Sequence, residues 1–85
     1  MVSNFIMVSV QPFLFKQKVA VYQDGVCIST IKCSLDDIED TIIALAKEYN
    51  INNIEITGKS AAYSLKIKDH LISKYTDKKL NINLC

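Results

Sequence analysis

The segment Gly58-Lys59-Ser60 has the residues with which a nucleotide-binding phosphate loop ends. Such a loop also needs a glycine five residues before Gly58, and position 53 is asparagine. The pattern of residues 51–57 predicts a strand that runs up to Gly58, which leaves no loop of backbone amides to surround a phosphate. We expect Gly58 to permit a turn and Ser60 to cap the next helix. A weaker anion contact by Lys59 and Ser60 at that helix start stays open.

Four acidic residues, Asp36, Asp37, Glu39 and Asp40, follow closely on Ser34. Clustered carboxylates can hold a metal ion, but these fall in the first turn of a predicted helix, where negative charge is stabilised by the helix dipole. Ser34 with Asp37 three residues later predicts a capping box. The pattern therefore favours a solvated helix start and no metal site.

The thiols and the single histidine also lack the spacing of a reactive site. Cys27 and Cys33 fall in one predicted strand about 20 Å apart, too far for a disulfide. No Cys-x-x-Cys pair exists to form a zinc site with His70, and Cys85 leaves the count odd. Asp69 lies about 100° around the helix from His70 and does not orient its imidazole. We expect free thiols, an exposed histidine, no catalytic residue and a cytoplasmic location.

The charged residues limit the classes of partner that can be expected. The chain has ten lysines, no arginine and nine acids, for a net charge of +1. The C-terminal third is locally basic, through Lys66, Lys68, Lys74, Lys78 and Lys79. Sequence-specific recognition of nucleic acid usually depends on arginine, and no aromatic residues alternate with these lysines for base stacking. A solvated lysine face is favoured, and nucleic acid is an unlikely partner.

Three consecutive bulky apolar residues, Phe13, Leu14 and Phe15, follow Pro12. Because neighbouring side chains of an extended chain point to opposite faces, at least one of them must lie away from a single core. Either both faces of the sheet are covered there, or one side is an interface with another chain. Both alternatives stay open. An edge strand beside this segment would also offer main-chain pairing to a partner.

Hydrophobic periodicity places these residues on secondary-structure elements. Strands are predicted over residues 5–10, 13–23, 26–33, 51–57 and 79–84, and helices over residues 34–50 and 60–75. The first strand is apolar on both alternations, which predicts a central strand covered on both faces. Asp24-Gly25 predicts a tight hairpin, and Asn50 a helix end. The last strand alternates strictly, which is typical of an edge strand.

The second helix has an apolar line of Tyr63, Ile67, Leu71 and Tyr75. Leu65 and Ile72 are expected to widen its buried side. A chain of 85 residues allows one domain, residues 1–85. The order β-β-β-α-β-α-β then predicts an α/β fold with a single mixed sheet: three antiparallel strands followed by two αβ units with right-handed crossovers.

This order resembles that of the ribonuclease H-like fold, including the half-domain of actin- and hexokinase-type ATPases. Residues 53–62 (NIEITGKSAA) are similar to the strand-glycine-helix segment that those ATPases use near the adenosine. The nuclease resemblance implies an aspartate in the first strand, yet residues 5–10 contain no acid and Asp24 lies in a turn. The ATPase resemblance implies a nucleotide held between two lobes, with a glycine pair and an Asp-Gly phosphate loop at the first strand, yet residues 5–10 contain no glycine, so we do not expect this single lobe to bind ATP. Only the fold is carried over.

These observations favour a small cytoplasmic protein that acts by protein–protein contact and is not an enzyme. We expect a self-associating accessory or inhibitor protein from a bacterium or phage, a homodimer with Phe13, Leu14 and Phe15 in its interface. No cofactor, small-molecule substrate or membrane segment is indicated, because no apolar run approaches about 20 residues. The alternative is a nucleic-acid-binding remnant of the ribonuclease H-like fold that uses the Lys-rich C-terminal third.

Overall fold

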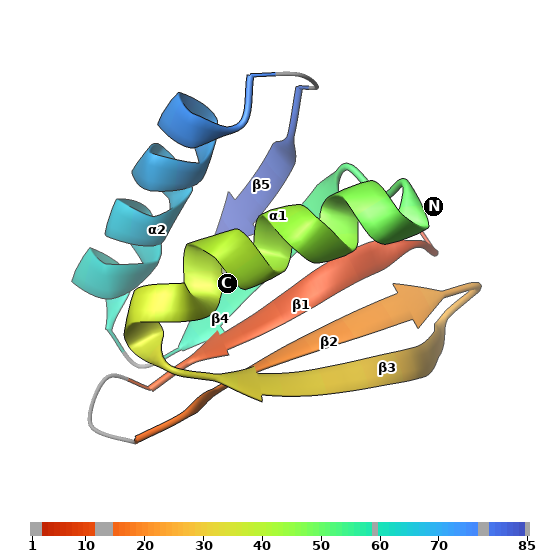
Figure 1. The fold of residues 1–85 in the computed structure, drawn as a ribbon, viewed down its shortest axis with the longest axis horizontal. Helices are drawn as coiled ribbons and strands as arrows, with labels where there is room; N and C mark the ends of the chain where they lie inside the picture. The colour runs from red at the N-terminus through yellow and green to blue at the C-terminus, as the bar shows by residue number, and fades with distance from the viewer. Residues whose placement is uncertain (1–2, 12–14, 59, 77–78, 85) are drawn as a thin grey trace.

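The structure, a computed structural model, describes residues 3–11, 15–58, 60–76 and 79–84. Figure 1 shows its elements, which are β1 (Phe5–Val10), β2 (Gln17–Gln23), β3 (Val26–Cys33), the 3-10 turn η1 (Leu35–Asp37), α1 (Ile38–Tyr49), β4 (Asn53–Gly58), α2 (Ala61–Lys74) and β5 (Asn81–Leu84). Strands β2, β4 and β5 begin later than the sequence predicts, and the predicted element order is confirmed.

The five strands form one mixed sheet in the order β3-β2-β1-β4-β5. β1 pairs antiparallel with β2, and β2 pairs antiparallel with β3. β1 and β4 are parallel, as are β4 and β5. The predicted α/β class, the three antiparallel strands and the edge position of β5 are therefore confirmed. The second edge of the sheet is β3.

The hairpin between β2 and β3 forms at the predicted dipeptide. Asp24 and Gly25 both have positive φ, 54° and 78°, as a tight two-residue hairpin turn requires. The segment before β1 holds this turn in place: the Asp24 amide donates to Asn4 Oδ1 at 2.9 Å, and the Gly25 amide donates to the Ser3 carbonyl at 3.0 Å. The turn is therefore fixed from outside the hairpin as well as by its own residues.

The first helix ends as predicted but begins differently. Asn50 adopts the left-handed conformation and donates its amide to the carbonyl of Ala46, which ends α1. The predicted capping box is wrong, because the Ser34 hydroxyl donates to Asp37 Oδ2 at 3.0 Å and caps no amide. A capping box uses a glutamate or glutamine, whose longer side chain reaches back to the backbone. Residues 35–37 instead form η1, and α1 starts at Ile38.

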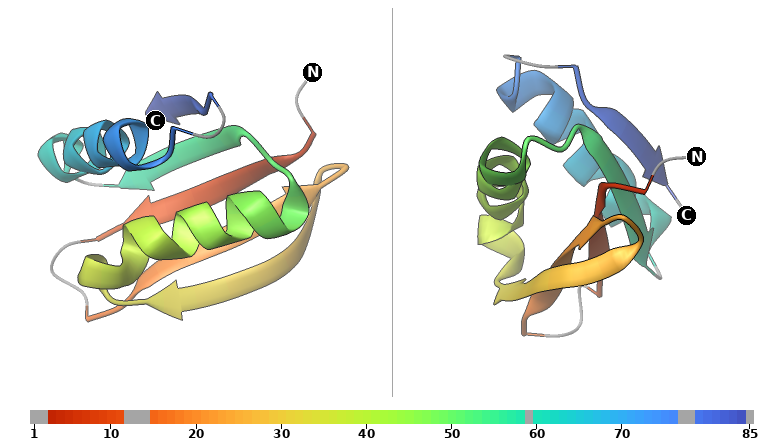
Figure 2. Two further views of the ribbon diagram at one scale, coloured as in Figure 1. Left: turned by 45° about the horizontal axis from the view of Figure 1, so that its top comes forward. Right: turned by 90° about the vertical axis from the view of Figure 1, so that its right-hand side faces the viewer.

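Both helices lie on the same face of the sheet (Figure 2). The strand residues in the core alternate along each strand and all belong to this helix-covered face. They are Ile6, Val8, Val10, Val19, Val21, Ile54, Ile56 and Ile82. The helices add Ile38, Ile42, Leu45, Ala46, Ile67 and Leu71 to the same cluster. The connections from β3 to β4 and from β4 to β5 cross the sheet in the same direction, so crossovers of the same hand place both helices on one face.

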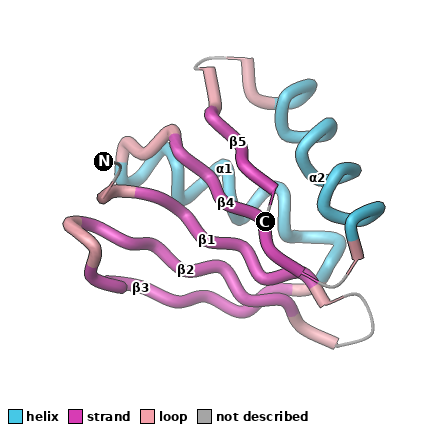
Figure 3. Tube along the Cα trace, turned by 180° about the vertical axis from the view of Figure 1, so that it is seen from behind, coloured by secondary structure: helices cyan, strands magenta, loops and turns pink. Residues whose placement is uncertain are grey.

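The opposite face, seen from behind in Figure 3, has no helix of the described residues over it. The prediction that the first strand is covered on both faces is therefore wrong. Phe5 and Met7 of β1 are half-buried, and the ring of Phe5 stacks on Tyr22 of β2 with centroids 4.8 Å apart. Cross-strand aromatic stacking shelters these side chains without a second layer. We call this side the helix-free face.

The apolar line of α2 is buried as predicted at Ile67, Leu71 and Tyr75, whereas Tyr63 is 38% exposed and the prediction is wrong there. The prediction that Leu65 and Ile72 widen the buried side is wrong, since they are 50% and 52% exposed. α2 packs at the margin of the sheet against β4 and β5, which covers only one stripe of the helix.

Gly58 illustrates how tightly β4 approaches β1. It is the last residue of β4 and pairs with Val10, and a methyl group built on it would overlap the Val10 carbonyl oxygen. We expect Gly58→Ala to lower the free energy of unfolding by about 2 kcal/mol, because the clash lies against backbone that cannot move aside. Denaturant unfolding measures this loss.

Gly25→Asn is the matched control. A side chain at Gly25 meets nothing within 4 Å, and asparagine tolerates the positive φ of this turn. Its effect should stay below about 1 kcal/mol, because only the left-handed backbone conformation opposes it. Equal losses for the two variants would contradict the close approach of β4 to β1.

Candidate functional site

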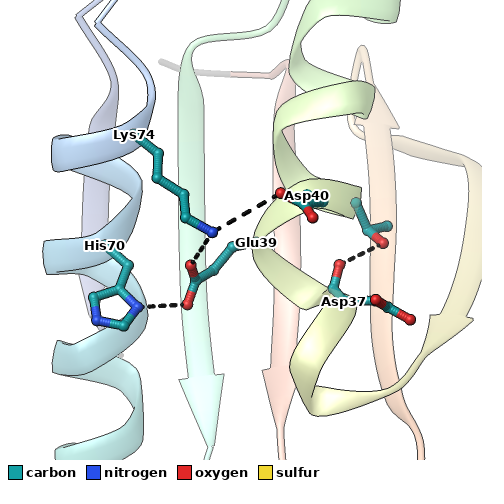
Figure 4. Close-up of polar contacts among 6 residues, drawn as sticks. Asp37, Glu39, Asp40, His70 and Lys74 are labelled. Atoms are coloured by element: carbon teal, nitrogen blue, oxygen red, sulfur yellow. Dashed lines mark hydrogen bonds and ion pairs between the residues drawn. The ribbon is translucent and has the colours of Figure 1, made fainter.

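A carboxylate on α1 joins two side chains of α2 (Figure 4). Glu39 Oε2 lies 2.9 Å from Nδ1 of His70, and Lys74 Nζ donates to Glu39 Oε1 at 3.1 Å. The hydrogen bond and the charge of Glu39 raise the pKa of Lys74 above its usual value, and the charge of Asp40 adds to this. We call Glu39, His70 and Lys74 the helix clasp, because they join α1 to α2.

The helix clasp borders a hollow of about 270 Å³, also lined by Asp36, Tyr63 and Lys66. A histidine held by a carboxylate is an arrangement that serves general acid–base catalysis in enzymes. Here no serine or cysteine is among the described residues that line the hollow, so the imidazole faces no such nucleophile. The geometry suits a contact between two helices.

Sequence reasoning missed the helix clasp. No sequence neighbour of His70 on α2 orients its imidazole. Its partner, Glu39, lies 31 residues earlier on α1. The available signal was the spacing of His70 and Lys74, since residues four apart on a helix share one face. Glu39 was expected in a solvated helix start, but its side chain is only 16% exposed, so that expectation is wrong for this residue.

The structure describes only one residue, Phe15, of the predicted interaction segment 13–15. Phe13 and Leu14 lie outside the described residues. Phe15 precedes β2 and is 90% exposed, the largest exposure among the described apolar side chains. Of the predicted anion contacts, Lys59 lies outside the described residues. The Ser60 hydroxyl accepts a hydrogen bond from the Tyr63 amide at 3.4 Å, which confirms its predicted role as the cap of α2.

Strand β3 is the most exposed apolar element of the sheet. Val26, Ile28 and Ile31 are 62%, 45% and 37% exposed, and β3 pairs with another strand only on the β2 side. Ile28 has no partner residue on β2, because the register shifts between Val21 and Tyr22. The outer edge of β3 therefore combines unpaired main-chain groups with apolar side chains.

The remaining candidates from the sequence are the thiols, the possible metal ligands, a membrane segment and the C-terminal lysines. Cys27 and Cys33 are free thiols, as predicted. Within residues 3–11, 15–58, 60–76 and 79–84, no group of three His, Cys, Asp or Glu side chains is placed to hold a metal ion. In the same ranges, no helix has both the length and the apolar character to cross a membrane. Of the C-terminal lysines, Lys74 is engaged by Glu39, and Lys66, Lys68 and Lys79 form no ion pair with a described residue.

No protein-family model, curated protein or solved structure gives a significant match to this chain.

The helix clasp predicts a pH-dependent difference in stability. We expect Glu39→Gln to lower the midpoint of thermal unfolding by a few degrees at pH 7, because both contacts with α2 lose their charged partner. A raised lysine pKa stabilises the fold below the usual lysine pKa, and this contribution disappears as the pH rises through the raised value. The gap between wild type and Glu39→Gln should therefore narrow in strongly alkaline buffer.

Asp69→Asn removes a negative charge from α2 at a residue that forms no ion pair with a described residue. Its midpoint should match that of the wild type. If Glu39→Gln matches the wild type at every pH, the helix clasp contributes nothing to stability.

Proposed function

We propose that this protein acts by protein–protein contact and binds a second copy of itself through β3. The observation that supports this best is an eight-residue edge strand whose Val26, Ile28 and Ile31 side chains are exposed. Long apolar edge strands pair readily with other chains, and monomeric proteins usually protect them with charges, prolines or a covering segment.

The two edges of the sheet differ in this protection. β5 is four residues long; Asn81 and Asn83 are exposed, and Leu84, 42% exposed, is its one exposed apolar side chain, against three on β3. β3 is twice as long and has one charged residue, Lys32, and no proline. The preferred pairing edge is therefore β3, rather than β5.

The geometry of a dimer follows from symmetry. Two identical edges related by a twofold axis pair antiparallel, so β3 of one copy would lie against β3 of the other. The two five-stranded sheets would join into one continuous sheet. Main-chain hydrogen bonds then supply affinity, and the side chains of Val26, Ile28 and Ile31 pack against their counterparts.

We further propose that the fold is of the ribonuclease H-like kind without its catalysis. The strand order and the single mixed sheet support the fold, and the lack of acidic residues in β1 supports the loss of nuclease chemistry. The free thiols of Cys27 and Cys33 support a cytoplasmic location, where cysteines stay reduced.

Analytical ultracentrifugation over a range of concentrations tests self-association. We expect a monomer–dimer equilibrium for the wild type. Ile28→Lys should weaken it at least about tenfold, because a charge at the edge opposes pairing. Ile72→Lys is the matched control: it makes the same substitution at an isoleucine of similar exposure on α2, and it should dimerise like the wild type.

Thermal unfolding of both lysine variants is the control that checks whether they fold. Phe15→Ser tests the segment predicted from the sequence, and a loss of dimer in this variant alone would move the interface from β3 to residues 13–15. A wild type that stays monomeric at millimolar concentration would overturn self-association.

A further inference from the structure

One row of the helix-free face consists of hydroxyl and ammonium groups. Cross-strand pairing places Thr57, Ser9, Lys18 and Lys32 side by side on β4, β1, β2 and β3. The next row on this face has Glu55, Met7, Ala20 and Thr30 in the same strands. Because rows lie about 7 Å apart, the cationic end of the first row is separate from the apolar centre of the face.

Lys18 and Lys32 are paired directly across β2 and β3. Side chains in such pairs start about 5 Å apart, and like charges directly opposite each other destabilise a sheet. Neither lysine forms an ion pair or hydrogen bond with a described residue, and the same is true of Lys16. Three lysine side chains therefore line one region of this face, and no carboxylate of the described residues forms an ion pair with them.

These lysines line a hollow of about 430 Å³ together with Ser9, Gln11 and Gln17. This volume is in the range of small-molecule sites, and no acidic side chain is among the described residues that line it. The net charge of the whole chain is only +1, so this local excess of positive charge reflects where the lysines are placed: outside the hollow, the nine acids outnumber the seven other lysines.

The wall of the hollow is fixed by a buried glutamine. Gln17 is 1% exposed; its Oε1 accepts from the Gln11 amide, and its Nε2 donates to the Gln11 carbonyl at 2.9 Å. The Gln17 side chain therefore binds both the backbone amide and the backbone carbonyl of Gln11. The two ends of the β1–β2 connection are clamped beside Lys16 and Lys18, which limits the freedom of this wall.

We propose that this hollow binds a phosphate-bearing ligand with at least two negative charges, contacted by Lys16, Lys18, Lys32 and the Ser9 hydroxyl. Lysine binds phosphate as a point charge with several N–H donors, and the chain has no arginine for two-pronged contacts. Three ammonium groups and a hydroxyl match the charge and the several acceptor oxygens of a phosphate monoester or diphosphate group. Bound anion removes the repulsion between Lys18 and Lys32.

Thermal unfolding in the presence of pyrophosphate tests the site. A ligand that binds only the folded state raises the unfolding midpoint in a concentration-dependent way. We expect this shift for the wild type, at ionic strength matched with sodium chloride. In Lys18→Gln/Lys32→Gln the affinity should fall at least about tenfold, because two charge-assisted contacts are lost. Without ligand, the same variant should be as stable as the wild type or slightly more so.

Lys66→Gln/Lys79→Gln removes the same charge from the C-terminal third and should keep the full shift. A second titration with single-stranded oligothymidylate identifies the source of the phosphate: half-saturation at a lower phosphate concentration than pyrophosphate assigns the hollow to nucleic-acid backbone, and the reverse assigns it to a small phosphorylated molecule. The proposal is overturned if pyrophosphate and oligothymidylate both fail to shift the wild type, or if Lys18→Gln/Lys32→Gln keeps the shift.

Discussion

Both parallel connections in this chain cross the sheet in the same direction, and most other features of the structure depend on this constraint. α1 leads from β3 to β4, and α2 continues from β4 to β5. Crossovers between parallel strands have one hand in nearly all proteins, so two that step the same way put their helices on the same face. The opposite face and the outer edge of β3 are left without a helix of the described residues.

The one-sided architecture also sets where stability comes from. The core is a single layer between α1, α2 and one face of the sheet, formed largely by isoleucine and valine. On the helix-free face, the stacked pair of Phe5 and Tyr22 shelters only part of its own surface. β3 contributes least to the core, and for that reason Val26, Ile28 and Ile31 remain exposed. Lys32 belongs to β3 and also lines the hollow with Lys16 and Lys18, so the proposed dimer interface and the proposed anion site share one strand.

Turns and helix ends could be predicted from the sequence, because each depends mainly on a residue and its neighbours in the chain. Asp24-Gly25, Asn50 and Ser60 each set a turn or a helix end as predicted, because these residue types favour the required backbone angles or cap locally. The row Ser9, Lys18 and Lys32 could not be seen, since it requires the register of three strands.

Two incorrect predictions show which features a local sequence pattern does not determine. The apolar alternation of the first strand predicted cover on both faces, but the strand order sends both crossovers across the sheet in the same direction, so the helices cover only one face. The contact of Glu39 with His70 joins residues 31 positions apart, and no local pattern links them. The mutual placement of α1 and α2 decides that contact.

The most direct test of the account is residue-resolved amide hydrogen exchange at low and high protein concentration. If two copies pair through β3, the outward-facing amides between Val26 and Cys33 gain protection as concentration rises, while those of α2 and β5 do not change. If β3 amides exchange at the same rate at all concentrations, or if the added protection falls on α2 or β5 instead, the free edge of β3 is not the interface.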